Sequence, residues 1–151
     1  MRRTVRRRRS AFTLIEVLLV AGILALLAAF AVPKLFGLAD QAKNDLARTA
    51  VGRNGPIAKA LDAFNWDMGR YPTTDEGLAI LLKKKGEVDD DHFKGPYLDN
   101  DRIADPFGEP FMFRSPGDVH EDSYDLWSKG KDRKDDGGKE GTDDIKNWIE
   151  K

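Results

Sequence analysis

A long, largely apolar run directly after a cluster of arginines constrains this chain most. The run extends from Phe12 to Val32 and is 21 residues long. A helix of this length rises about 30 Å, which matches the hydrocarbon core of a bilayer. Six arginines and no acidic residue precede it: Arg2, Arg3, Arg6, Arg7, Arg8 and Arg9. Positive charge beside a spanning helix stays on the cytoplasmic side, so we expect a single-pass membrane protein with its N-terminus there.

The rest of the chain is polar and acidic. The whole sequence has 25 basic and 26 acidic residues, and six of the basic ones precede the apolar run. This acidic remainder is a poor general binder of nucleic acid. An arginine run can itself form a nucleic-acid-binding arm, but one that directly abuts about twenty apolar residues more often sets membrane orientation. The chain has no cysteine, which excludes disulfides and thiolate metal sites. A hard cation held by oxygen ligands remains as a means of cross-linking a small polar domain.

Glu16 lies inside the apolar run, and it decides how the run is interpreted. An ordinary secretory signal peptide, with Leu18 to Ala31 as its apolar region, is the simplest alternative. A buried carboxylate costs several kcal/mol unless it has a partner, and a signal peptide has no use for one. Cleavage between Ala11 and Phe12 would create a free amine on Phe12. The amine of one subunit would then compensate Glu16 of a neighbour when the helices assemble.

The segment from Ser10 to Val17 (Ser-Ala-Phe-Thr-Leu-Ile-Glu-Val) resembles the leader-cleavage motif of type IV pilins and pseudopilins. The resemblance implies that a prepilin peptidase cuts after Ala11 and methylates the amine of Phe12. Residues 1–11 are then a cleaved leader, and residues 12–32 form a transmembrane helix through which subunits polymerise, with Glu16 in assembly. The chain departs from the motif at Ala11, where the family nearly always has Gly, so we expect slower processing.

Residues 33–151 predict a small α+β domain that begins with a continuation of the long helix. Pro33 predicts a kink or local melting, and Gly52 to Pro56 predict a break. Thr73 and Glu76 have the spacing of a capping box, so a second helix is expected from there to about Lys85. Short extended pieces are expected around Tyr97-Leu98, Phe111 to Arg114 and Tyr124 to Trp127, which suit a small antiparallel sheet on the helix.

Later segments resemble one family more closely, the major pseudopilins of the type II secretion system. They are, in order, Gly69 to Leu78, Asp105 to Phe111, Ser115 to Gly117 and Asp144 to Trp148. The resemblance implies a pilin-like fold and a structural role in a periplasmic pseudopilus that drives export of folded proteins across the outer membrane. It implies a homopolymer whose partners are minor pseudopilins, the prepilin peptidase and the inner-membrane assembly platform. It also implies an inner-membrane subunit with a periplasmic C-terminal domain.

The tail after Asp122 is dense in acidic residues and glycines, and in an unfamiliar protein a solvated acidic loop is the simpler interpretation. The stretch from Asp125 to Asp132 (Asp-Leu-Trp-Ser-Lys-Gly-Lys-Asp) resembles the calcium-binding segment of major pseudopilins. The resemblance implies structural calcium held by Asp125 and Asp132 with backbone carbonyls. Asp143 and Asp144 are further candidates because they are near in sequence.

Two alternatives remain beside the pseudopilin interpretation. A long type IV pilus subunit for adhesion, motility or DNA uptake usually has a C-terminal disulfide loop, which a chain without cysteine cannot form. A lipid-anchored hydrolase would need a general base or an open metal position in a cleft. The sequence has no nucleotide-binding glycine loop and no catalytic-triad spacing, so we expect no enzymatic activity.

Overall fold

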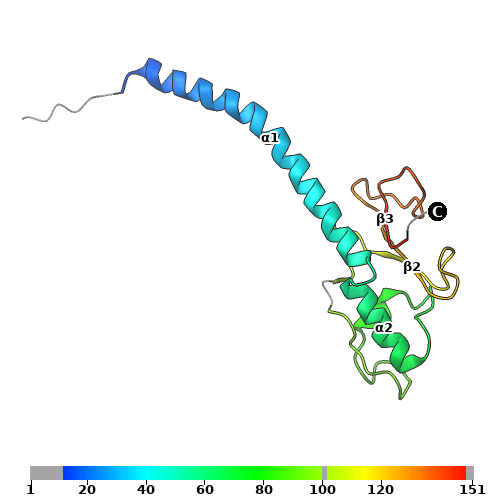
Figure 1. Ribbon diagram of the computed structural model, residues 1–151. Helices are drawn as coiled ribbons and strands as arrows, with labels where there is room; N and C mark the ends of the chain where they lie inside the picture. Colours follow the sequence, from blue (N-terminus) through cyan, green and yellow to red (C-terminus); the bar gives the residue numbers. More distant parts are fainter. Residues whose placement is uncertain (1–11, 100–101, 149–151) are drawn as a thin grey trace, which may run out of the picture. The chain divides into compact units, whose positions relative to one another are not determined.

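The computed structural model describes residues 12–99 and 102–148. The chain divides into two compact units, one up to Ala39 and one from Asp40 onward. The described residues form a long N-terminal helix, a shorter second helix, a short 3-10 helix and three short strands (Figure 1). The fold is α+β, as predicted.

Helix α1 extends over Leu14–Val51, 38 residues, and its composition explains its length (Figure 1). Leu and Ala dominate it, and both are strong helix formers. Its first turn holds Glu16 and its last turn holds Arg48, each placed favourably for the helix dipole. The backbone is helical through Pro33, so the local melting that the sequence predicts there does not occur.

The predicted break after α1 is confirmed, and it has a clear local cause. Helix α2 begins at Pro56 and ends at Met68, with Gly55 as its N-cap residue and Pro56 in its first turn. Proline suits this turn because its missing N–H would have no helical partner there. Gly69 ends the helix in the left-handed conformation at φ 71°, and its N–H bonds the carbonyl of Asn65 at 2.8 Å.

The expected helix after Thr73 is replaced by a turn and a short 3-10 helix, η1, over Leu78–Leu82. The capping box does form: Glu76 N–H donates to the Thr73 hydroxyl at 3.2 Å, and Thr73 N–H donates to Glu76 at 2.7 Å. Gly77 then adopts φ 56°, which an α-helix cannot continue through. The capping box therefore closes one turn only.

Three strands form one antiparallel sheet in the order β1-β2-β3. They are β1 (Met112–Arg114), β2 (Asp125–Ser128) and β3 (Ile145–Lys146). Strand β2 is central, pairing Phe113 with Leu126 on one side and Ile145 with Ser128 on the other. The first two strands match the predicted ones, whereas β3 was not predicted.

Tyr97 and Leu98 do not form the strand that the sequence predicts. Their N–H groups both donate to the carbonyl of Leu81, at 2.8 and 3.1 Å, so the segment is held against η1 as a loop. The Tyr97 hydroxyl also donates to Asp67 on α2 at 3.0 Å. These hydrogen bonds to Leu81 and Asp67 take the place of the bonds to a neighbouring strand that a β-strand would make.

The core joins the end of α1, α2, η1 and the sheet in one apolar cluster. Its fully buried large side chains come from all of these parts: Val51, Ile57, Leu61, Phe64, Leu81, Phe93 and Leu126. Phe64, Phe93 and Tyr97 meet edge to face with centroids 5.3 to 6.1 Å apart. Aromatic packing of this kind adds about 0.5–1.5 kcal/mol per pair beyond burial.

Candidate metal centre and apolar helix

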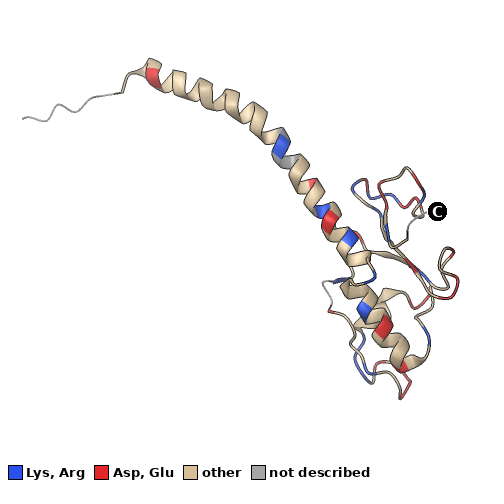
Figure 2. Cartoon of the chain, in the orientation of Figure 1, with Lys and Arg blue, Asp and Glu red and all other residues tan. Residues whose placement is uncertain are grey.

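The apolar first half of α1 has the properties that a membrane-spanning segment needs. It is the one helix in the described part of the chain that is long and apolar enough to cross a bilayer, and its apolar window is not buried within the protein. The sequence has no charged residue between Glu16 and Lys34, and Figure 2 accordingly shows a long stretch of α1 without red or blue. Large side chains such as Leu14, Leu24 and Phe30 are exposed along it, as expected of a helix that packs against lipid or other helices.

Glu16 lies at the N-terminal end of α1 and makes a local contact that the sequence analysis missed. Its N–H donates to the Thr13 hydroxyl at 3.3 Å, and Thr13 N–H donates to its carboxylate at 3.5 Å. This is the reciprocal pattern of a capping box, although both distances are long. Phe12 is exposed beside it. Ala11 and the rest of the predicted leader, residues 1–11, lie outside the described residues.

The C-terminal loop brings together three carboxylates: Asp132, Asp136 and Asp143. One oxygen from each lies within 4.8 Å of the others. Asp132 and Asp143 were candidates from the sequence, whereas Asp136 was not. Sequence proximity alone could not single it out among the many acids of this loop.

Two hydrogen bonds shape this loop around Asp132. The N–H of Asp132 donates to the Asp143 carboxylate at 2.8 Å, which joins the two ends of the loop. The N–H of Lys134 donates to the Asp132 carboxylate at 2.8 Å and lowers its pKa. The Lys134 ammonium lies 3.5 Å from the same carboxylate and adds to the lowering. Asp132 is therefore well suited to remain ionised.

Gly130 allows the two ends of the loop to come close. It adopts φ 67°, and a Cβ atom at this position would lie 2.2 Å from the carbonyl oxygen of Asp143. Any other residue would push Asp143 away from Asp132. The glycine in the Ser-Lys-Gly-Lys-Asp stretch thus has a specific steric role.

Asp144 adds an orphaned oxygen to the same loop. One of its carboxylate oxygens accepts the Gly138 N–H at 2.7 Å, and the other is buried with no hydrogen-bond partner among the described residues. Desolvation by burial raises the pKa of Asp144, and the neighbouring Asp136 and Asp135 charges raise it further. A buried, unpaired carboxylate oxygen beside other carboxylates is the environment that a bound cation would compensate.

Asp125 lies apart from these carboxylates. It is the first residue of β2, whereas Asp132 follows the end of that strand, so the two are separated by its length. The buried Asp125 carboxylate accepts the N–H of Val119 at 2.8 Å and of His120 at 3.2 Å. The His120 ring lies 2.9 Å away. Asp125 thus holds the turn between β1 and β2, and its role as a calcium ligand stays a prediction.

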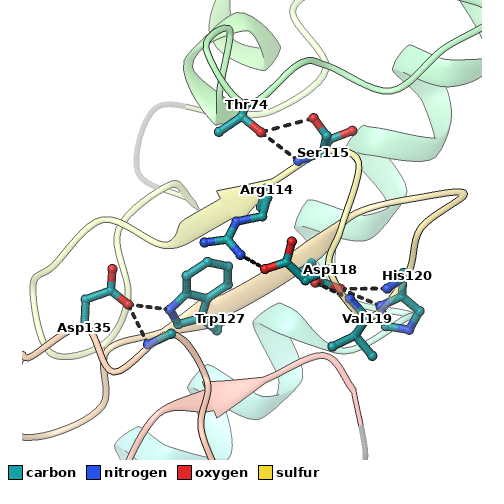
Figure 3. A network of polar contacts seen from close by, with 10 residues as sticks. Thr74, Arg114, Ser115, Asp118, Val119, His120, Trp127 and Asp135 are labelled. Atoms are coloured by element: carbon teal, nitrogen blue, oxygen red, sulfur yellow. Dashed lines mark hydrogen bonds and ion pairs between the residues drawn. The ribbon is translucent and has the colours of Figure 1, made fainter.

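Polar side chains fasten the loop and the neighbouring turns to the sheet (Figure 3). The Trp127 indole N–H donates to Asp135 at 2.9 Å, and the Thr74 hydroxyl bridges the backbone of Ser115. Lys131 pairs with Asp40 on α1 at 2.7 Å. The acidic loop is therefore anchored on both sides, to β2 and to the second unit's part of α1.

Comparison with known proteins identifies the two parts of the chain separately. Residues 34–148 match the family model described as "Type II secretion system (T2SS), protein G". Residues 6–32 match the model described as "Prokaryotic N-terminal methylation motif". The second match covers the arginine cluster, Ala11, Phe12 and Glu16.

Relatives over nearly the whole length carry one name, Type II secretion system core protein G. The protein from Pseudomonas aeruginosa is 40% identical over 145 residues, covering 95% of this chain and 97% of the relative. The protein from Aeromonas hydrophila is 37% identical, and the match covers 95% of this chain and 94% of the relative. The protein from Vibrio cholerae is 36% identical, and the match covers 94% of this chain and 93% of the relative.

A solved structure agrees with the fold. The crystal structure of the major pseudopilin from the type 2 secretion system of enterohaemorrhagic Escherichia coli matches with a TM-score of 0.56 and 28% identity. The match covers 77% of this chain and 95% of that one. By sequence and by fold, this chain belongs to the protein G family of the type II secretion system, the family of its major pseudopilin.

Proposed function

We propose that this chain polymerises through its N-terminal helix into a pseudopilus that drives export of folded proteins across the outer membrane. One observation carries the proposal: a domain of the protein G family follows an exposed apolar helix in the same chain. The first turn of that helix carries an acidic residue, Glu16. The helix supplies the contact between copies, and the domain forms the outer surface. The type IV pilus alternative is not favoured, because the matching family and relatives belong to type II secretion.

Membrane insertion precedes assembly in this account. The arginines at the N-terminus remain cytoplasmic, and the domain that begins after Val32 is exported to the periplasm. A prepilin peptidase removes residues 1–11 and methylates Phe12. Minor pseudopilins and the inner-membrane assembly platform are the expected partners of the mature subunit. The subunit acts as a building block and carries out no catalysis of its own.

The mature N-terminus tests this proposal. The intact mass of the chain extracted from membranes should correspond to a protein that begins at Phe12 and carries one added methyl group. Substituting Ala11→Gly, the residue usual in the motif, should raise the processed fraction. A mature chain that begins near Ala31, or one that retains Met1, would contradict processing by a prepilin peptidase.

We further propose that calcium stabilises the C-terminal loop. Asp132, Asp143 and Asp136 supply three carboxylate oxygens within reach of one ion, and Asp144 adds a buried oxygen that has no hydrogen-bond partner among the described residues. Calcium suits such a site because it accepts oxygen ligands in flexible geometry. When bound it would cross-link the two ends of the loop electrostatically.

A further inference from the structure

An apolar groove opens at the junction of α1 and α2 in the second unit. It has a volume of about 280 Å³. Six apolar side chains line it: Leu46, Ala50, Pro56, Ala104, Pro106 and Phe111. Thr49 and Arg102 complete the lining, so a single guanidinium borders an otherwise apolar surface.

Trp66 is the second feature, and it lies on α2. Among the described residues from Asp40 onward, three large apolar side chains are exposed: Leu46 at 62%, Trp66 at 88% and Val119 at 51%. An exposed tryptophan is unusual on the surface of a small domain and typical of a residue that anchors an interface. Leu46 already belongs to the groove.

Trp66 cannot fill the groove of its own chain. It lies ten residues along α2 from Pro56, which is about 15 Å at 1.5 Å per residue. Both features are therefore available to other molecules at once. When a protrusion and a groove lie on different surfaces of one chain, the protrusion of one copy can enter the groove of the next. Such a head-to-tail contact between copies builds an open helical filament unless it closes into a ring.

The chemistry of the two surfaces is complementary. Asp62 lies one helical turn before Trp66 on α2 and is exposed, so a carboxylate accompanies the indole. Arg102 at the groove can pair with that carboxylate and stack on the indole ring, because a guanidinium is attracted to the face of tryptophan. We propose that Trp66 of one copy inserts into the groove beside Leu46 and Arg102 of a second copy, as a lateral contact between pseudopilus subunits.

This inference rests on the proposed polymerisation, and filament yield tests it in the full chain. Trp66→Ala and Leu46→Lys should each lower the yield of filaments from cells at least about tenfold at an unchanged level of subunit in the membrane. Val119→Lys is the matched control, since it charges an exposed apolar position outside the groove, and it should assemble normally. Normal filament yield from Trp66→Ala overturns the proposal. Filaments of the unmodified chain establish polymerisation independently.

Cross-linking locates the contact directly, because the chain has no cysteine of its own. Thr49→Cys places a thiol at the groove, and Ala63→Cys places one beside Trp66. When the two variants are co-expressed, a short thiol-reactive linker should join them into dimers that neither variant forms alone. Adding Trp66→Ala to the Ala63→Cys copy should reduce the dimer at least about tenfold, whereas Trp66→Phe should retain it. Filaments that form without this dimer, or a dimer insensitive to Trp66→Ala, overturn the proposal.

Discussion

Arg70 shows how one side chain can organise a whole segment. Its guanidinium donates to both carboxylate oxygens of Glu76, at 2.6 and 2.8 Å, and to the carbonyl of Tyr71 at 3.1 Å. It also lies over the Phe64 ring, 5.6 Å from the centroid. Glu76 in turn caps the turn that begins at Thr73. The Gly-Arg-Tyr-Pro-Thr-Thr-Asp-Glu segment is thus held to the core by one planar cation.

This arrangement predicts an acid-dependent loss of stability. The hydrogen bonds from Arg70, with those from Thr73, lower the pKa of Glu76 from its ordinary 4.5 to about 2. Because the folded-state pKa is lowered, the stabilisation is fully present above about pH 4.5 and is lost as the pH falls toward 2. We expect it to be about 1–2 kcal/mol, because Arg70 is 45% exposed and water screens the pair.

The free energy of unfolding of the detergent-solubilised chain measures this contribution. At pH 7, Glu76→Gln should be less stable than the unmodified chain by that amount, and the difference should vanish toward pH 2. Asp75→Asn, at the neighbouring exposed position, is the matched control and should change little. A difference between Glu76→Gln and the unmodified chain that stays constant from pH 7 to pH 2.5 would show that the ion pair is not its cause.

Among the elements, the C-terminal loop is the one whose order depends on charge. It joins β2 to β3, and it brings the side chains of Asp132 and Asp143 together. Two carboxylates that share one site repel each other. Gly130 allows the approach, and the hydrogen bonds from Asp132 and Lys134 partly offset the repulsion. A divalent cation bound between the carboxylates would offset the remaining repulsion between Asp132 and Asp143.

We therefore expect calcium to stabilise the folded chain. At a hundredfold excess over the dissociation constant, a ligand that binds only the native state contributes about 2.7 kcal/mol, which raises the melting temperature of a domain of this size by about 5–10 °C. Thermal melting with calcium and with chelator measures the shift. The double variant Asp132→Asn, Asp143→Asn should abolish it.

Matched variants separate a calcium site from a general effect of charge. Asp89→Asn with Asp91→Asn removes two exposed carboxylates elsewhere and should leave the shift unchanged. Asp125→Asn tests whether that residue also ligates: a ligand role predicts a smaller shift, and a role in holding the turn predicts equal destabilisation with and without calcium. A melting temperature indifferent to calcium in the unmodified chain would refute the site.

The elements also show what a sequence can and cannot predict. The break at Gly52 to Pro56 and the strands around Phe113 and Leu126 follow from local signals, and the structure confirms them. The helix after Thr73 was wrong because the conformation of Gly77 overrides a well-formed cap. Strand β3 has two residues, too few for any periodicity, and depends on pairing with the distant β2.

The residues of the candidate metal site were likewise predicted only in part from the sequence. Asp132, Asp143 and Asp144 were predicted by resemblance and proximity, and the loop does bring the first two together. Asp136 was missed because its position depends on how the glycines fold the loop. Asp125 was paired with Asp132 from a linear motif, and a motif does not reveal that Asp125 begins strand β2 whereas Asp132 lies in the loop beyond its end.

At the scale of the whole molecule, the chain combines a helix whose first half is apolar and exposed with a largely polar α+β domain. Within the apolar stretch from Phe12 to Val32, the helix carries one carboxylate, Glu16, at its N-terminal end. Among the described residues of one chain, the hydrogen bond to the Glu16 carboxylate comes from the N–H of Thr13, at a long 3.5 Å. In a bundle of such helices, the amine on Phe12 of a neighbouring copy would be a stronger partner. Assembly would then compensate both charges.

Filament yield in Glu16 and Thr13 variants is the measurement that tests this central claim most directly. Glu16→Leu leaves the neighbour's amine unpaired, which costs about 3–5 kcal/mol in a buried setting, so filaments should decrease more than about tenfold while the subunit remains in the membrane. Thr13→Ala removes the local cap but keeps the carboxylate, and it should still assemble. Normal filaments from Glu16→Leu, or an equal loss in both variants, would contradict the account, since the carboxylate would then act only as a helix cap or not at all.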